Sequence, residues 1–106
     1  MADDFVFSAL ANPVRRRLLE LLTEGPKTAG HLAGQFDLSR PAVSEHLQVL
    51  RRADLVREEP SGRERYYHLS AGPLAEVEAW LHPFERYWRD RLRSLSDTLD
   101  EEDDPT

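Results

Sequence analysis

Two short stretches, residues 39–52 and 62–65, carry side chains that can donate several hydrogen bonds to a nucleic acid. Thirteen of the 14 basic residues are arginines, whose planar guanidinium group can donate two parallel hydrogen bonds to a phosphate or to a guanine edge. A glutamine amide can pair with adenine in a similar way. The composition is therefore compatible with DNA binding, although arginine is also common on solvated helices.

The first of these stretches has the spacing of an amphipathic helix, with Val43, Leu47 and Leu50 on one face. Polar and basic residues occupy the opposite face and its borders. Together with two arginines of the second stretch they are the candidate DNA-binding residues: Ser39, Arg40, Pro41, Ser44, Glu45, His46, Gln48, Arg51, Arg63 and Arg65. The alternative is that they form only the solvated side of a surface helix, since every such helix has a polar face.

Individual roles follow from the chemistry of these side chains. Gln48 is expected to pair with adenine, and Arg40 with guanine or a phosphate. Arg63 and Arg65 are expected at the tip of a hairpin, where they would contact phosphates. Glu45 either repels phosphate or accepts a hydrogen bond from a cytosine amino group.

Other chemistries find little support in the sequence. The absence of cysteine excludes disulfides, thiol nucleophiles and thiolate metal sites. His82 and Glu85 share one helix turn but make only half of a ligand set, and the other three histidines fall on three different predicted elements. No nucleophile elbow, catalytic triad or Gly-rich phosphate loop is present. We therefore expect no metal, no cofactor and no enzymatic activity.

The elements that position the candidate residues can be predicted from caps and periodicity. A first helix starts at Pro13 after the N-cap Asn12 and stops near residue 25. Thr28 caps a short second helix, and Ser39 caps a third that continues to about Ala53. Two strands, residues 55–59 and 63–69, are expected to form a hairpin around a turn at residues 60–62.

A last helix is predicted to begin after Gly72–Pro73 and to continue through Pro83 with a kink. Its apolar residues recur at spacings of three and four, close to a coiled-coil seam: Leu74, Val77, Leu81, Phe84, Trp88, Leu92, Leu95 and Leu99. So short a chain offers this stripe no evident partner, and a second copy would supply one.

The net charge of -6 arises at the C-terminal end, where six acidic residues lie within residues 97–106. The other 14 acids balance the 14 bases of residues 1–96. We expect one domain over residues 1–99 and an acidic, disordered tail over residues 100–106. No apolar run is long enough to span a membrane and the start lacks a signal peptide, so a cytoplasmic location is expected.

The order helix, short helix, turn, helix, hairpin and final helix is that of a winged helix-turn-helix, mainly α with a small β-hairpin. The residues themselves resemble the ArsR (ArsR/SmtB) family of bacterial transcriptional repressors over residues 5–99. The matching segments are LANPVRRRLLELL (10–22), TAGHLA (28–33), SRPAVSEHLQVLR (39–51), ADLV (53–56), the wing from GR (62–63) to YYHL (66–69), and AEVEAWL (75–81).

The resemblance implies a homodimer whose first and last helices form the interface, and which binds an inverted-repeat DNA operator and represses transcription until a signal releases it. The expected interface residues are Phe5, Phe7, Leu10, Leu81, Phe84, Trp88 and Leu92. Metal-sensing members of the family carry cysteine pairs, or paired histidines and carboxylates along the last helix. This chain has neither, so the resemblance implies a regulator that does not respond to metals.

Two alternatives remain open at this point. The neutral charge of residues 1–96 and the position of Glu45 are compatible with a protein-interaction module of the same fold that has little DNA affinity. The aromatic residues of the last helix, among them Trp80 and Tyr87, are compatible with a dimer interface that encloses an apolar small-molecule effector.

Overall fold

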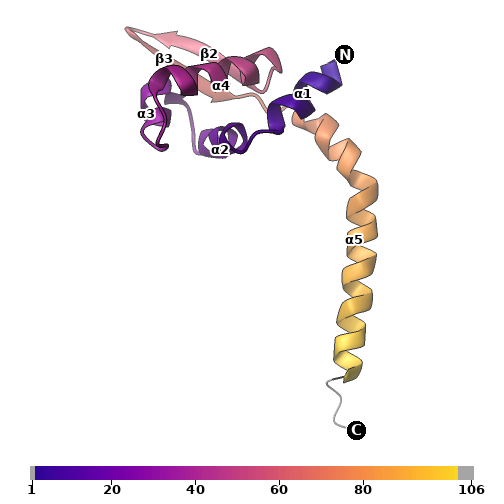
Figure 1. The fold of residues 1–106 in the computed structure, drawn as a ribbon. Coiled ribbons are helices and arrows are strands. Elements are labelled where there is room, and N and C mark those ends of the chain that lie inside the picture. Colours follow the sequence, from indigo (N-terminus) through magenta and orange to yellow (C-terminus); the bar gives the residue numbers. More distant parts are fainter. Residues whose placement is uncertain (1, 103–106) are drawn as a thin grey trace.

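The computed structural model describes residues 2–102, which form helices around a small antiparallel sheet (Figure 1). The elements in chain order are α1 (Ala2–Leu10), α2 (Pro13–Leu22), β1 (Lys27–Thr28), α3 (Ala29–Ala33), α4 (Arg40–Arg52), β2 (Val56–Ser61), β3 (Glu64–Leu69) and α5 (Leu74–Glu102). The fold is mainly helical, as predicted. None of the helices in this described part combines the length and hydropathy needed to cross a membrane.

The three predicted helix starts are confirmed by their caps. At each one a side-chain oxygen accepts hydrogen bonds from backbone N–H groups that have no partner within the helix. The bonds measure 2.8 to 3.2 Å: Asn12 with Val14 and Arg15, Thr28 with His31, and Ser39 with Ala42. Pro13 and Pro41 stand in the first turns, where a missing N–H costs nothing.

Strands β2 and β3 form the predicted hairpin, called the wing below, but its turn lies later than expected. Ser61 pairs with Glu64, so the turn consists of Gly62 and Arg63 and not of residues 60–62. Gly62 has φ +63°, which suits glycine at the first central position of a two-residue turn.

The turn was misplaced because Pro60 is normally a strand breaker. Here Pro60 belongs to β2, which is an edge strand of the sheet. Within the described part of the chain no strand lies on the outer side of β2, so a proline is tolerated there without the loss of a pairing on that outer side. Strand β1 was not predicted. This two-residue strand pairs with the other side of β3, with Lys27 opposite Tyr67.

The core lies between α2, α3, α4 and the sheet. Its largest fully buried side chains come from every one of these helices and from the segment before β2: Leu18, Leu32, Val43, Leu47, Leu50 and Leu55. The predicted apolar stripe of α4 thus faces inward. Because this face is fixed in the core, the opposite face of α4 is left toward solvent.

Helix α1 was not predicted, and it is held partly by the helix that follows it. The Arg15 guanidinium donates to the carbonyl oxygens of Ala9 (2.7 Å) and Ser8 (3.1 Å), and Arg16 donates to that of Leu10 (2.8 Å). These bonds satisfy carbonyls at the end of α1 that have no partner within the helix.

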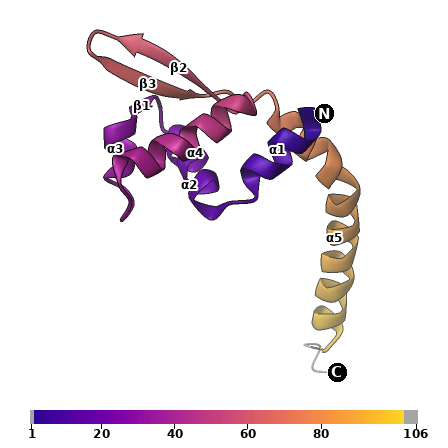
Figure 2. The ribbon, with the colours of Figure 1, turned by 45° about the horizontal axis from the view of Figure 1, so that its top comes forward.

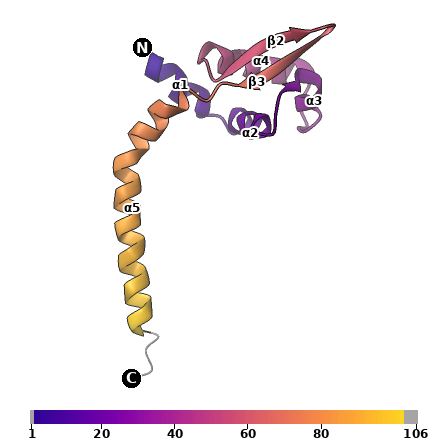
Figure 3. The same ribbon diagram turned by 180° about the vertical axis from the view of Figure 1, so that it is seen from behind.

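Helix α5 begins on the core and then leaves it. Leu74 and Val77 pack against the buried cluster, whereas the side chains from Trp80 to Thr98 are exposed. The helix projects away from the rest of the molecule in every view (Figures 1 and 3) and continues through Pro83 to Glu102. The predicted tail, residues 100–106, therefore begins inside α5, and residues 103–106 lie outside the described residues.

Candidate DNA-binding surface

The outward face of α4 presents the short polar side chains that the sequence predicted there. Pro41, Glu45 and Gln48 are all exposed, with the core stripe of α4 on the opposite side. The wing extends alongside and beyond α4 (Figure 2). A helix face and a hairpin are thus available to the same ligand.

A groove of about 430 Å³ separates the start of α4 from the wing, and we call it the arginine groove. Its lining consists of Thr28, Ala29, Gly30, Arg40, Ser44, Arg63, Glu64, Arg65 and Tyr67. Three arginines against one glutamate give the lining a positive balance, and the hydroxyl groups of serine, threonine and tyrosine add hydrogen-bonding capacity. Such a groove suits an anionic chain such as a phosphate backbone.

Arg40 reaches across the groove to the start of α3. A Cβ built on Gly30 would lie 3.6 Å from the guanidinium carbon of Arg40, so the guanidinium group covers this glycine at van der Waals distance. Arg63 is placed by the turn of the wing. The two arginines thus belong to opposite ends of the surface, one at α4 and one at the tip.

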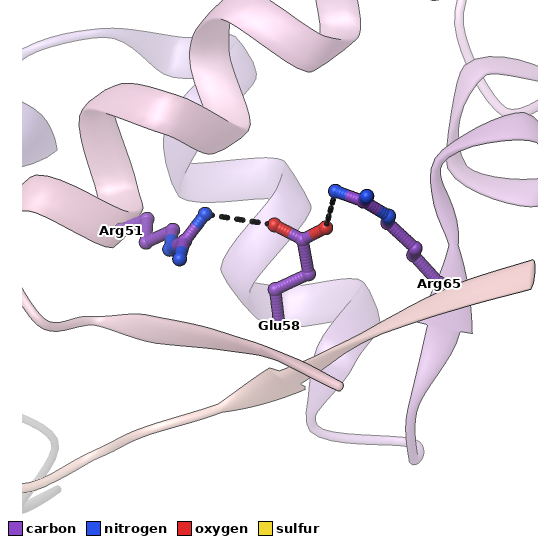
Figure 4. Close-up of polar contacts among 3 residues, drawn as sticks. All are labelled: Arg51, Glu58 and Arg65. Atoms are coloured by element: carbon purple, nitrogen blue, oxygen red, sulfur yellow. Dashed lines mark hydrogen bonds and ion pairs between the residues drawn. The ribbon is translucent and has the colours of Figure 1, made fainter. Parts of the chain in front are cut away.

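One carboxylate connects α4 to the wing (Figure 4). Arg51, in the last turn of α4, donates to Glu58 Oε2 at 2.9 Å, and Arg65 of β3 donates to Glu58 Oε1 at 2.8 Å. The Glu58 side chain is only 7% exposed. Arg65 itself pairs with Pro60 along the ladder and is not part of the turn. The prediction that it stands at the wing tip was therefore wrong.

Tyr67 lies directly across the ladder from Glu58. Burial raises the pKa of Tyr67, and the negative charge of Glu58 raises it further, while Arg51 and Arg65 oppose the shift. The phenol therefore stays uncharged at neutral pH and leaves the positive balance of the groove intact.

His46 does not point from the exposed face of α4. Its ring is partly buried, and its Nδ1 lies 3.4 Å from the Arg15 guanidinium, which also holds the end of α1. The Ser39 hydroxyl is likewise used within the protein, as the cap of α4. Both residues, predicted as DNA contacts, thus support the position of α4.

The structure therefore divides the ten candidates into groups. Four line the arginine groove: Arg40, Ser44, Arg63 and Arg65. Three lie exposed on α4, namely Pro41, Glu45 and Gln48. The remaining three, Ser39, His46 and Arg51, make contacts inside the protein. Glu58 was not among the predicted site residues. The alternation of side chains along the strand, which is visible in the sequence, places it on the same face as the buried Val56.

The predicted interface residues form an exposed apolar surface along α1 and α5. Phe5 (58%), Phe84 (47%), Trp88 (61%) and Leu92 (58%) are the most exposed, Phe7 and Leu81 are exposed less, and Leu10 is partly buried against the core. The ring of Trp80 contacts those of Phe7 (centroids 5.8 Å apart) and Phe84 (5.0 Å), which joins the two helices.

His82 Nδ1 lies 4.0 Å from Glu85 Oε2 on the solvated side of α5. Among the side chains that the structure describes, residues 5–98, no three histidine or acidic groups come together as a potential metal site.

A helix-turn-helix pair, an exposed second helix and a hairpin beside it define a winged helix-turn-helix DNA-binding protein. A helix-turn-helix domain family matches residues 10–59. The chain is 40% identical over 105 residues to the HTH-type transcriptional regulator Rv2034 of Mycobacterium tuberculosis, which covers 99% of this chain and 95% of that protein. It is 37% identical over 79 residues to the transcriptional repressor SdpR of Bacillus subtilis, covering 74% and 88% of the two chains.

The fold leads to the same group of proteins. The crystal structure of an ArsR family transcriptional regulator matches with a TM-score of 0.71 and 35% identity, over 81% of this chain and 89% of that one. The chain belongs to the ArsR family of winged helix-turn-helix transcriptional regulators. It is a DNA-binding regulator and not an enzyme.

Proposed function

We propose that this protein is a repressor that binds an inverted-repeat operator as a homodimer, without responding to metals. In each half-site α4 enters the major groove, and the arginine groove receives the phosphate strand that runs between α4 and the wing. The observation that carries the proposal is the position of the arginine groove directly beside the exposed polar face of α4.

The dimensions of α4 support this placement. Its 13 residues span about 20 Å at the rise of an α-helix, enough to lie in the major groove. The small and polar side chains on its outer face let the backbone approach the base pairs. In this proposal Gln48 pairs with adenine, and Arg40 with guanine or a phosphate.

The wing supplies contacts that do not depend on sequence. Arg63 lies in the two-residue turn, where the hairpin reaches farthest from α4, and its charge suits a backbone phosphate. Such contacts fix the orientation of the protein on the duplex, while α4 selects the bases.

The exposed apolar residues of α5 support the dimer. Phe84, Trp88 and Leu92 would remain in water in a monomer, and the same helix of a second copy would cover them. A two-fold axis through this contact presents two α4 helices to one face of the duplex. The half-sites are then about 34 Å apart and inverted.

Selection from a random library of duplex DNA tests the proposal. The wild-type protein should enrich an inverted repeat, and its affinity for duplex should fall steeply with salt, because phosphate contacts release counterions. The interaction-module alternative predicts that no sequence is enriched and that salt has little effect.

A further inference from the structure

Glu58 occupies the junction between α4 and the wing. Its carboxylate is nearly buried, yet both of its oxygens accept charged hydrogen bonds from Arg51 and Arg65. We infer that Glu58 is a positioning residue that determines DNA specificity by fixing the wing relative to α4. The inference rests on the proposed function.

The geometry explains how one carboxylate can do this. Arg51 lies in the last turn of α4, Glu58 on β2 and Arg65 on β3, so the two hydrogen bonds connect α4 to both strands of the wing. A carboxylate that is shielded from water is stable only with such partners. The wing therefore cannot swing away from α4 without breaking the bond from Arg51, which is one of the two that compensate this shielded charge.

The two arginines remain available to DNA while they are held. Their side chains are 51% and 73% exposed, and each guanidinium group has five N–H donors, of which only one is bound to Glu58. Glu58 thus turns two flexible cations into donors of fixed orientation. Fixed donors favour the sequence whose backbone shape fits them, whereas free cations attract every duplex alike.

The neighbouring Glu59 provides a matched control. It lies next along β2 and faces the other side of the strand, where its carboxylate is 3.3 Å from Arg57 and 3.1 Å from His68. Its side chain is 54% exposed. Glu58→Gln and Glu59→Gln change the net charge equally, but only the first breaks the link between α4 and the wing.

The test measures affinity for two probes of equal length, the duplex most enriched by the wild-type protein and a random duplex. For Glu58→Gln we expect the ratio of the two affinities to fall about tenfold, the effect of losing one charge-assisted hydrogen bond. Affinity for the random duplex should stay constant or rise, because a negative charge is lost. Glu59→Gln should leave the ratio within about twofold of the wild type.

A variant that is merely less stable would bind both probes more weakly by the same factor and leave the ratio unchanged. Glu58→Asp gives a second test, since it keeps the charge but is too short to reach both arginines, and it should also lower the ratio. Equal ratios for the variants of Glu58 and Glu59 would overturn the inference alone. A wild-type protein that enriches no duplex would overturn the proposed function and this inference with it.

Discussion

Replacing Trp88 with alanine tests how the proposed dimer is held together. Trp88 lies in the middle of the exposed stripe of α5, and 61% of its surface is open to solvent. For a tryptophan this corresponds to roughly 120 Å². At about 25 cal/mol per Å², covering that area contributes about 3 kcal/mol per protomer.

In a symmetric dimer the loss is felt in both copies, so Trp88→Ala should weaken the dimer by about 6 kcal/mol. Because each 1.4 kcal/mol corresponds to a factor of about ten, the dissociation constant should rise about 10⁴-fold. A dimer that dissociates at nanomolar concentration would then dissociate near ten micromolar. Operator affinity should fall as well, since a monomer makes only half of the contacts.

Sedimentation velocity over a range of protein concentrations measures this directly. Tyr87→Ala is the comparison variant, because Tyr87 is also aromatic and 53% exposed; its ring meets that of Trp88 edge-on, with centroids 6.3 Å apart, but it points about 100° around the helix, toward Arg91. We expect Trp88→Ala to be monomeric at low micromolar concentration and Tyr87→Ala to remain dimeric. A stable Trp88→Ala dimer, or a dimer dissociated by Tyr87→Ala instead, would refute the assignment of this interface.

Three further predictions concern the DNA-binding surface and its support. Gln48→Ala should change which bases are selected, whereas Arg63→Ala should weaken binding to all duplexes alike and make the salt slope of binding shallower by about one. Library selection and salt titration distinguish the two effects. A changed base preference for Arg63→Ala would reverse the assigned roles. Zinc or a chelator should leave operator affinity unchanged in a gel-shift assay, and a large zinc-dependent shift would restore His82 and Glu85 as a metal site. Ser39→Ala should lower the free energy of unfolding by about 1 kcal/mol in chemical denaturation, because the cap of α4 is lost, and an unchanged stability would contradict the role of that hydrogen bond.

Helix starts were predictable because they depend on neighbours in the sequence. A cap such as Ser39 binds a backbone group three residues later, and the stripe of α4 repeats within two turns, so both are visible locally. The candidate face of α4 followed from the same periodicity.

The features that were not predictable depend on contacts between different elements. Strand β1 has two residues and exists only through its pairing with β3, and α1 is held by Arg15 of the next helix. The partner of His46 is likewise 31 residues away. The Glu58 carboxylate binds two arginines, each seven residues away in the sequence, one before it and one after it. Alternation along β2 indicates that Glu58 points inward, but it does not indicate that Glu58 connects α4 to the wing.

Footprinting of the wild-type protein on its most enriched duplex tests the central claim most directly, when combined with the stoichiometry of the complex in solution. The proposed function predicts two protected half-sites related by two-fold symmetry, about 34 Å apart, with two protomers per duplex. Protection of a single half-site by one protomer would contradict it.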